Sequence, residues 1–134
     1  MVETSCQYYF DAYSFKTDIL TDDSTQSVKT DSSGKIRCRL CEEHITDGQS
    51  GIYHNGNHIH CERNPGGHKF RFATYQDAPG CLTIGEASFE HSWFSGYNWQ
   101  IALCRSCSEH LGWLFSGNSR FYGLIIDKLI DEDN

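Results

Sequence analysis

Two cysteine pairs carry the clearest chemistry in the sequence. Cys38 and Cys41 form one Cys-x-x-Cys unit, Cys104 and Cys107 form a second one, and 62 residues separate the two units. A tight turn over two intervening residues aims both thiolates of a pair at one point, and two such turns supply the tetrahedral ligand set that zinc prefers. The spacing therefore predicts one zinc ion bound by these four cysteines.

The predicted zinc is structural, because four cysteine ligands leave no coordination position at which water could be activated. Bringing together the ends of the 62-residue segment costs about 4 kcal/mol in chain entropy. A structural zinc contributes on the order of 10 kcal/mol. A thioredoxin-like redox role would need a βαβ context, which the sequence pattern lacks. We therefore expect the metal to hold a sheet module together.

The remaining thiols are expected to be unremarkable. The chain has seven cysteines, an odd number, which in a reducing compartment indicates metal ligation and not disulfides. We expect Cys6, Cys61 and Cys81 to be plain small side chains. His58, His60 and Cys61 lie close together in the sequence, so a second metal site there is conceivable. We favour the alternative, in which these are ordinary loop histidines that face solvent or form hydrogen bonds.

The three tryptophans of the chain form the second informative group. Trp93, Trp99 and Trp113 fall within 21 residues, and Gly96 permits a turn that folds Trp93 back towards Trp99. A small sheet has little room for three indoles that each need an N–H partner, so a purely structural role for all three is disfavoured. Three indoles around a gap would suit a planar neutral ring, or a methylated ammonium held by cation–π attraction.

Short strands are expected to position these groups. Residues 51–54 and 59–61 flank Asn55-Gly56, a dipeptide that favours a tight hairpin turn. Trp99, Ile101 and Leu103 alternate with other residues and so share one face of a strand. Residues 121–130 are apolar enough to form one final strand. Because the sequence shows no long helical period, we predict an antiparallel all-β architecture.

Size and charge limit the function. The 134 residues suit one domain, which we place at residues 34–134 after a flexible polar leader over residues 1–33. A formal net charge of −7 repels phosphate backbones and disfavours a nucleic-acid binder. The sequence has no apolar run long enough for a membrane span and no secretory signal, so we expect no membrane partner and a cytoplasmic or nuclear location.

The order of the motifs resembles a known family. The resemblance covers roughly residues 35–130, including Cys38, Cys41 and the Asn64-Pro65 turn. The thalidomide-binding CULT domain of cereblon is similar to this chain in His91-Ser92-Trp93-Phe94-x-Gly96-Tyr97-x-Trp99, Cys104-x-x-Cys107, His110-Leu111-Gly112-Trp113-x-Phe115 and Phe121-Tyr122-Gly123-Leu124. The resemblance implies a zinc-stapled β-tent, in which two antiparallel sheets meet at an angle.

The same resemblance implies a pocket that binds without catalysing a reaction. Its expected ligands are cyclic imides, such as the glutarimide of thalidomide, and C-terminal cyclic imides on damaged proteins. A glutarimide presents one donor between two acceptors, which a short backbone segment can satisfy. Carried over by position, the ligand-binding set is Trp93, Trp99 and Trp113 as walls, Phe115 as floor, His91, Ser92 and the backbone of Trp93 around the imide, and Asn64 from a loop.

The chain also departs from the family. Gly66 and Gly67 follow Asn64-Pro65 where cereblon has bulkier residues, which would loosen this loop and weaken its contact with a ligand. In addition, 134 residues leave no room for the Lon-like region of cereblon, so binding to a ubiquitin-ligase adaptor is not expected.

Two other functions are open alternatives. One is an aromatic-cage reader of methylated lysine or similar cations, for which Glu90 and Glu109 are the nearby acids. The other, which we disfavour, is a methionine-R-sulfoxide reductase-like enzyme, since those enzymes also carry two zinc-binding cysteine pairs. That chemistry needs a reactive cysteine beside the substrate, and Cys61 and Cys81 are the spare thiols.

Overall fold

The computed structural model describes residues 34–131, and the predicted leader over residues 1–33 lies outside them. Nine strands and two short 3-10 turns make up this part of the chain, so the all-β prediction is confirmed. In chain order the elements are β1 (Lys35–Cys38), β2 (His44–Asp47), η1 (Gly48–Ser50), β3 (Ile59–Arg63), β4 (Lys69–Tyr75), β5 (Cys81–Ser88), β6 (Asn98–Cys104), β7 (His110–Ser116), β8 (Arg120–Ile125), η2 (Ile126–Lys128) and β9 (Leu129–Asp131).

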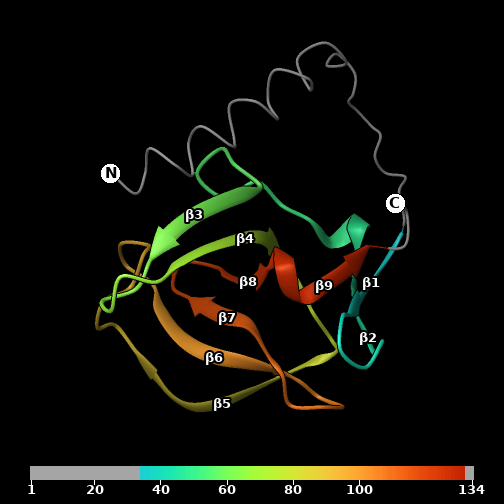
Figure 1. The fold of residues 1–134 in the computed structure, drawn as a ribbon. Helices are drawn as coiled ribbons and strands as arrows, with labels where there is room; N and C mark the ends of the chain where they lie inside the picture. The colour runs from blue at the N-terminus through green and yellow to red at the C-terminus, as the bar shows by residue number, and fades with distance from the viewer. Residues whose placement is uncertain (1–33, 132–134) are drawn as a thin grey trace.

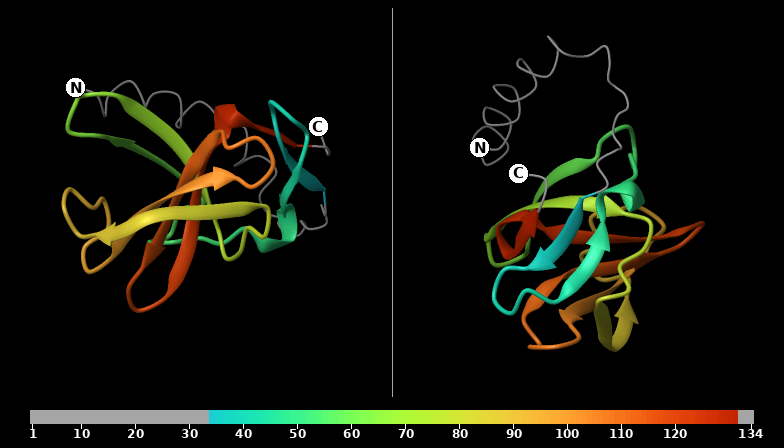
Figure 2. Two further views of the ribbon diagram at one scale, coloured as in Figure 1. Left: turned by 90° about the horizontal axis from the view of Figure 1, so that it is seen from below. Right: turned by 90° about the vertical axis from the view of Figure 1, so that its right-hand side faces the viewer.

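The strands form two sheets, as predicted. The small sheet has the order β2-β1-β9, and the large sheet has the order β3-β4-β8-β7-β6-β5. Every pairing between neighbouring strands is antiparallel. The small sheet stands beside one end of the large sheet and is turned relative to it (Figures 1 and 2). This arrangement is the two-sheet tent that the motif order implies.

The last segment of the chain belongs to both sheets. After β8 ends at Ile125, the η2 turn carries the chain away, and Leu129 of β9 pairs with Cys38 of β1. The amide of Arg39 also donates to the carbonyl of Lys128 at 2.9 Å. The prediction of one strand over residues 121–130 is therefore wrong, because the turn moves the chain from the large sheet to the small one.

The turn at Asn55-Gly56 is confirmed, but the strand predicted before it is not. Asn55 and Gly56 have φ values of 54° and 84°, and the amide of His54 donates to the carbonyl of Asn57 at 2.9 Å. Residues 51–54 make only isolated bridges, one of them between Gly51 and Tyr75. This stretch is therefore a loop that leads into β3.

The large sheet buries a different core on each face, because consecutive strand residues point to opposite sides. Phe72 pairs with Ile125, and the next residue, Ala73, pairs with Leu124. One cluster holds mainly small and aliphatic residues: Ile36, Cys38, Ile45, Ala73, Tyr75, Ala78, Cys104, Leu111, Leu124 and Leu129. The other is aromatic: Phe72, Phe94, Trp113, Phe115 and Phe121, with Ile125. The aromatic cluster is the one that positions the candidate cavity.

Candidate metal site and ligand cavity

The four predicted ligands meet at one point between the two sheets. Their sulfur atoms all lie within 4.8 Å of one another. The Sγ atoms of Cys38 and Cys107 are 3.7 Å apart, and those of Cys41 and Cys104 are 3.6 Å apart. Tetrahedral zinc with Zn–S bonds of ~2.3 Å requires sulfur separations of ~3.8 Å. The side chains therefore fit a zinc ion, and this cluster is the candidate metal site.

The two cysteine pairs share one local structure. Cys38 ends β1 and Cys104 ends β6, and a turn follows each of them. In each turn, the amide of the residue four positions later donates a hydrogen bond to the cysteine carbonyl. Glu42 donates to Cys38 at 2.8 Å, and Ser108 donates to Cys104 at 2.9 Å. Both of these residues have a φ of 68°. The repeated turn brings both sulfurs of a pair to the same side.

Backbone amides favour the thiolate form that binds metal. A hydrogen bond from the backbone of Glu43 lowers the pKa of Cys41 to about 7. Burial raises the pKa of Cys104, but the amides of Ser106 and Cys107 oppose this by donating to its Sγ at 3.4 and 3.5 Å. The turns therefore supply donors to the sulfurs as well as geometry.

Two arginines join the site to its surroundings. Arg105 lies in the second cysteine turn, and its Nε is 2.7 Å from the Glu43 carboxylate beside the first turn. Arg39 lies in the first turn, and its guanidinium donates to the carbonyls of Asp127 and Leu129 at 3.0 and 3.3 Å. Both cations stand beside a cluster that carries negative charge when its thiols ionise.

The prediction that the three remaining cysteines are plain small side chains holds for one of them and fails for another. Cys61 is disulfide-bonded, so the prediction that it is a plain small side chain is wrong. Cys81 is a free thiol as expected, and burial raises its pKa to about 12. Cys6 lies outside the described residues. Cys81 therefore stays protonated near neutral pH and lacks the thiolate that a nucleophile needs.

The crowded histidines do not form a second metal site in the described part of the chain, where the four cysteines are the one group that could hold an ion. His58 donates Nδ1–H to the carbonyl of Ile52 at 2.9 Å. His60 donates Nε2–H to the carbonyl of Asn57 at 3.0 Å. The prediction that these histidines are hydrogen-bonded is confirmed, but His60 lies in strand β3 and not in a loop.

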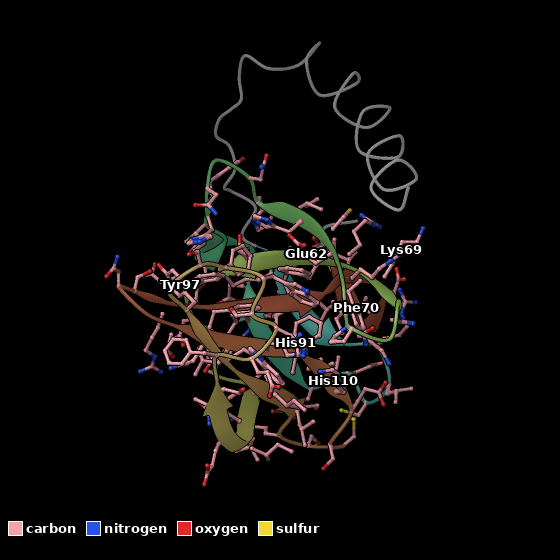
Figure 3. The ribbon with its side chains drawn as sticks, turned by 90° about the vertical axis from the view of Figure 1, so that its left-hand side faces the viewer. Glu62, Lys69, Phe70, His91, Tyr97 and His110 are labelled. Atoms are coloured by element: carbon pink, nitrogen blue, oxygen red, sulfur yellow. The ribbon has the colours of Figure 1, made fainter. Side chains whose placement is uncertain are left out.

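A cavity of about 350 Å³ lies over the aromatic face of the large sheet, within the range of small-ligand pockets. It is lined by Asn64, Pro65, Phe70, His91, Trp93, Trp99, Ile101, His110, Trp113 and Phe115. Phe70, His91 and His110 come from three different segments and gather in the middle of this face (Figure 3). The cavity brings together all three tryptophans and all the other predicted ligand residues except Ser92.

Strand register explains four of the ten lining residues. In the β6–β7 pair, Trp99 lies opposite Phe115 and Ile101 lies opposite Trp113. Since these residues are two apart on each strand, all four side chains stand on one face of the sheet. Trp113 and Phe115 are 7% and 1% exposed, so they form the fixed inner part of the cavity.

The loop between β5 and β6 adds His91 and Trp93. Gly96, with a φ of 83°, permits the turn in which the amide of Tyr97 donates to the carbonyl of Phe94 at 3.0 Å. This turn folds Trp93 back, and its ring stands edge-on to that of Trp113 with centroids 4.9 Å apart. The loop therefore supplies the outer wall.

The indole N–H groups of two walls are already occupied. Trp93 donates to the carbonyl of Arg63 at 2.9 Å, and Trp99 donates to the carbonyl of Glu90 at 2.8 Å. These bonds fix the ring planes and satisfy both donors away from the cavity. The rings consequently offer their apolar faces to a ligand.

Two of the predicted polar ligand residues have local structural roles. The hydroxyl of Ser92 donates to the carbonyl of Phe94 at 3.1 Å and accepts from its amide at 3.3 Å, and Ser92 does not line the cavity. The side-chain oxygen of Asn64 accepts from the amide of His68 at 2.9 Å, which closes the loop between β3 and β4. Asn64 nevertheless lines the cavity.

Sequence reasoning missed four lining residues: Pro65, Phe70, Ile101 and His110. Phe70 stands edge-on to Trp113 with centroids 5.0 Å apart and acts as a further wall. His110 donates Nε2–H to the carbonyl of Gly112 at 3.0 Å, and burial lowers its pKa. Ile101 could have been found from its place on the same strand face as Trp99.

Glu90 and Glu109, the two acids considered for a cation cage, lie close to basic side chains. The Glu109 carboxylate pairs with the ammonium of Lys128. The Glu90 carboxylate lies 3.9 Å from Nε2 of His91. Neither side chain is in the lining, and among residues 34–131 no acid lines the cavity. The cavity is therefore apolar and without formal negative charge.

Comparison with known proteins supports the motif-based resemblance. Cereblon of Danio rerio is 42% identical to this chain over 73 residues, which are 50% of this chain and 17% of that relative. Cereblon of Gallus gallus is 38% identical over 73 residues, 50% of this chain and 16% of that relative. Cereblon of Drosophila virilis is 55% identical over 31 residues, 23% of this chain and 5% of that relative. No family model matches the chain.

Half of the chain is therefore cereblon-like, and it is consistent with a CULT domain in its sequence, its two sheets and its four-cysteine cluster. The chain spans less than a fifth of the length of these relatives. In the described range, no helix has the length and apolar character needed to cross a membrane.

Proposed function

We propose, from the premise that half of this chain is cereblon-like, that the domain binds small uncharged cyclic ligands of the cyclic-imide class in its three-tryptophan cavity. In this proposal the domain binds without catalysing a reaction, and its cysteine cluster holds one structural zinc ion. Ligands of this class are glutarimide-containing molecules such as thalidomide, and peptides that end in a cyclic imide.

The observation that carries the proposal is the chemistry of the lining. Five aromatic rings and two aliphatic side chains surround the cavity, and its remaining side chains are one amide and two imidazoles. A planar ring without charge can stack on such walls at no cost in buried charge. A volume of about 350 Å³ also suits a small ring better than a large ligand.

The loop that bears Trp93 offers polar groups suited to an imide. Neither the backbone N–H nor the carbonyl of Trp93 takes part in the hydrogen bonds found among residues 34–131. An imide presents an N–H between two carbonyls, so one backbone carbonyl and one backbone amide can satisfy it. We propose that Trp93 provides this pair, with His91 and Asn64 at the rim, and that Ser92 acts by holding the loop.

The two alternatives are less well supported. A cage for methylated ammonium would gain from a carboxylate in its lining, but neither Glu90 nor Glu109 lines this cavity, and Glu109 pairs with Lys128. A sulfoxide reductase needs a reactive thiol at the substrate, but Cys61 is disulfide-bonded and Cys81 is a protonated thiol outside the lining. The non-enzymatic imide-binding function is therefore preferred.

A titration tests the proposal. Glutarimide added to the zinc-loaded protein should change the tryptophan fluorescence with saturation, and calorimetry should give the dissociation constant. Trp99→Ala should weaken binding at least ~5-fold, because a wall residue of a buried aromatic site contributes more than ~1 kcal/mol. Leu82→Ala removes a 53%-exposed side chain on β5 that is outside the cavity lining, and should leave the dissociation constant unchanged.

The outcomes separate the candidates. Unaltered glutarimide binding in Trp99→Ala would remove this cavity as the site. Binding of trimethyl-lysine peptide without binding of glutarimide would favour the cation reader. Binding of a peptide with a C-terminal cyclic imide, but not of the same peptide with an open carboxylate, would extend the proposal to modified protein ends.

A further inference from the structure

Three histidines in one short segment pack against the aromatic core beside the cavity. His54, His58 and His60 lie in the stretch from the loop after η1 into β3. Their rings stand against aromatic side chains on β4, on β8 and on the loop that carries Trp93. The cavity described above does not use them.

His54 is the histidine most surrounded by rings. It stacks on Phe121 of β8 with centroids 4.2 Å apart and an interplanar angle of 27°. It also stands edge-on to Phe94 at 4.9 Å and to Tyr97 at 5.4 Å, both in the cavity loop. A neutral imidazole fits this apolar site, whereas a protonated one would lose its hydration there.

His60 connects the segment to a cavity wall. Its ring stacks on Phe72 with centroids 5.5 Å apart, and Phe72 stacks in turn on Trp93 at 5.3 Å. The two interplanar angles are 16° and 18°, so the three rings are nearly parallel. Since Phe72 lies between His60 and Trp93, the packing of His60 on Phe72 supports the orientation of the Trp93 ring, which is a wall of the cavity.

Phe94 gives a second connection. It is 4% exposed and directly follows Trp93 in the cavity loop. His54 and His60 both stand edge-on to it, at 4.9 and 5.3 Å. If the histidines withdrew, Phe94 would lose contacts on that side, and the loop would lose part of its anchor.

Burial is the largest influence on the charge of these histidines and opposes it, although backbone carbonyls near His58 and His60 favour their charged forms. His58 stands edge-on to Tyr75 at 5.3 Å, and burial raises the pKa of Tyr75 to about 12, so this phenol is neutral. The remaining titratable side chains in ring contact are Tyr53, against His58, and Tyr97, against His54. Within residues 34–131 no carboxylate contributes to the pKa of these histidines, and His54 and His58 oppose the charging of His60.

We propose that the segment bearing His54, His58 and His60 is an acid-sensitive clamp on the cavity loop: protonation drives the segment off the aromatic core, and the cavity then releases its ligand. Above neutral pH the neutral rings hold Phe72 and Phe94 in place. Below it, charged imidazoles leave the apolar site and repel one another. The clamp is a two-state element that a proton biases.

The direction of the pH dependence follows from burial. Burial lowers the pKa of all three histidines below the ordinary value of 6.5. In a detached segment these pKa values would return to ordinary, so the open form binds more protons than the closed form. Opening therefore becomes more favourable as the pH falls through about 6.5, by up to ~10-fold per pH unit for each proton gained.

The affinity measurement rests on the proposed function, because it uses glutarimide as the ligand. The hydrogen-exchange measurement needs no ligand and does not rest on it. Glutarimide affinity is measured from pH 7.5 to 5.5, and hydrogen exchange of residues 52–60 and 89–97 is followed without ligand at the same pH values. We expect affinity to fall at least ~10-fold between these pH values and exchange, corrected for its intrinsic pH dependence, to rise. Zinc content is monitored, because acid also displaces metal from thiolates.

Matched variants assign the effect. The double variant His54→Phe with His60→Phe keeps both rings but cannot gain protons, so most of the acid-induced loss of affinity should disappear. His60→Gln is a second variant, which can still donate to the carbonyl of Asn57. His44→Gln removes a histidine that bonds Asp47 instead of the aromatic core, and should keep the parent profile. Melting temperatures at pH 7.5 verify folding.

The possible results of these measurements distinguish failure of the clamp from failure of the proposed function. An identical pH profile in the parent and the double variant would show that His54 and His60 do not carry the dependence, and would overturn the clamp. Unchanged hydrogen exchange of residues 52–60 down to pH 5.5 would overturn it as well. If glutarimide does not bind even at pH 7.5, the proposed function fails, while the exchange measurement still tests the clamp.

Discussion

Edge-to-face packing keeps the cavity open at the level of single residues. The Trp93 ring stands at 82° to that of Trp113, and the Phe94 ring stands at 84° to that of Phe115. Such pairs contribute ~0.5–1.5 kcal/mol each beyond the area they bury. Rings held at right angles cannot collapse into a flat stack, so a gap remains between the walls.

Gly123 leaves room for the aromatic rings packed over β8. It lies opposite Trp113 on β8, and a Cβ added there would come within 2.7 Å of Phe72 Cδ2 and 3.0 Å of Phe115 Cε2. Gly123→Ala should therefore displace both rings and destabilise the domain by ~1–3 kcal/mol. Urea unfolding followed by tryptophan fluorescence measures the change.

The control for this substitution is Gly66→Ala, in the loop between β3 and β4. A Cβ at Gly66 would meet only the side-chain oxygen of Asn64, at 3.5 Å. The substitution should change the free energy of unfolding by less than ~0.5 kcal/mol. Equal stability of the two alanine variants would show that the rings over Gly123 move aside without cost.

Residue types and spacing alone predicted the metal cluster and the grouping of the tryptophans. Cys-x-x-Cys units need only local turns, so their geometry can be inferred from sequence. Phe70 was missed because the place of β4 in the order of the large sheet brings it to the cavity, and no short-range pattern reveals that order. Ser92 was placed in the ligand set by resemblance, and its hydroxyl instead bonds the backbone of Phe94.

At the scale of elements, the two cysteine turns show how backbone conformation fixes the metal site. Each turn needs a left-handed residue directly after its second cysteine, and this residue is Glu42 in one turn and Ser108 in the other. Neither is glycine, so each turn carries a steric cost of ~1 kcal/mol or more. In the proposed zinc-bound form, metal binding would offset that cost.

Substitution at Ser108 tests this conformation. Valine is β-branched and fits a φ of 68° poorly, so Ser108→Val should weaken zinc retention against a chelator. Ser108→Gly should retain zinc as well as the parent or better. Ser106→Val introduces the same side chain into the same turn at a residue whose φ is not positive, and should have little effect. If both valine variants retain zinc equally, backbone conformation at Ser108 does not limit the site.

Strands with alternating apolar residues were predictable, and the switch between sheets was not. Trp99 and Ile101 share one face of β6 as expected. The chain from Phe121 to Ile130 reads as one apolar run, but its last part pairs with β1, which lies more than 80 residues earlier in the sequence. A pattern within the run cannot report a partner at that distance.

At the scale of the molecule, the candidate metal site lies where the two sheets meet. Cys38 ends a strand of the small sheet, and Cys104 ends a strand of the large sheet. The chain crosses between the sheets again at η2, close to the same cysteines. The aliphatic core cluster, which includes both Cys38 and Cys104, lies around this junction. An ion bound by the four cysteines would therefore stabilise the arrangement on which this core cluster depends.

Loss of one ligand should consequently unfold the domain and not merely empty the site. Cys107→Ser, or removal of zinc by a chelator, takes away on the order of 10 kcal/mol, more than the net stability of most domains of this size. Far-ultraviolet circular dichroism should then lose its strand signal. Cys81→Ser is the matched control, because Cys81 is a free thiol that pairs with Cys104 across β5 and β6 without belonging to the cluster. A strand signal that persists in metal-free protein would mean that the two sheets stay packed without zinc.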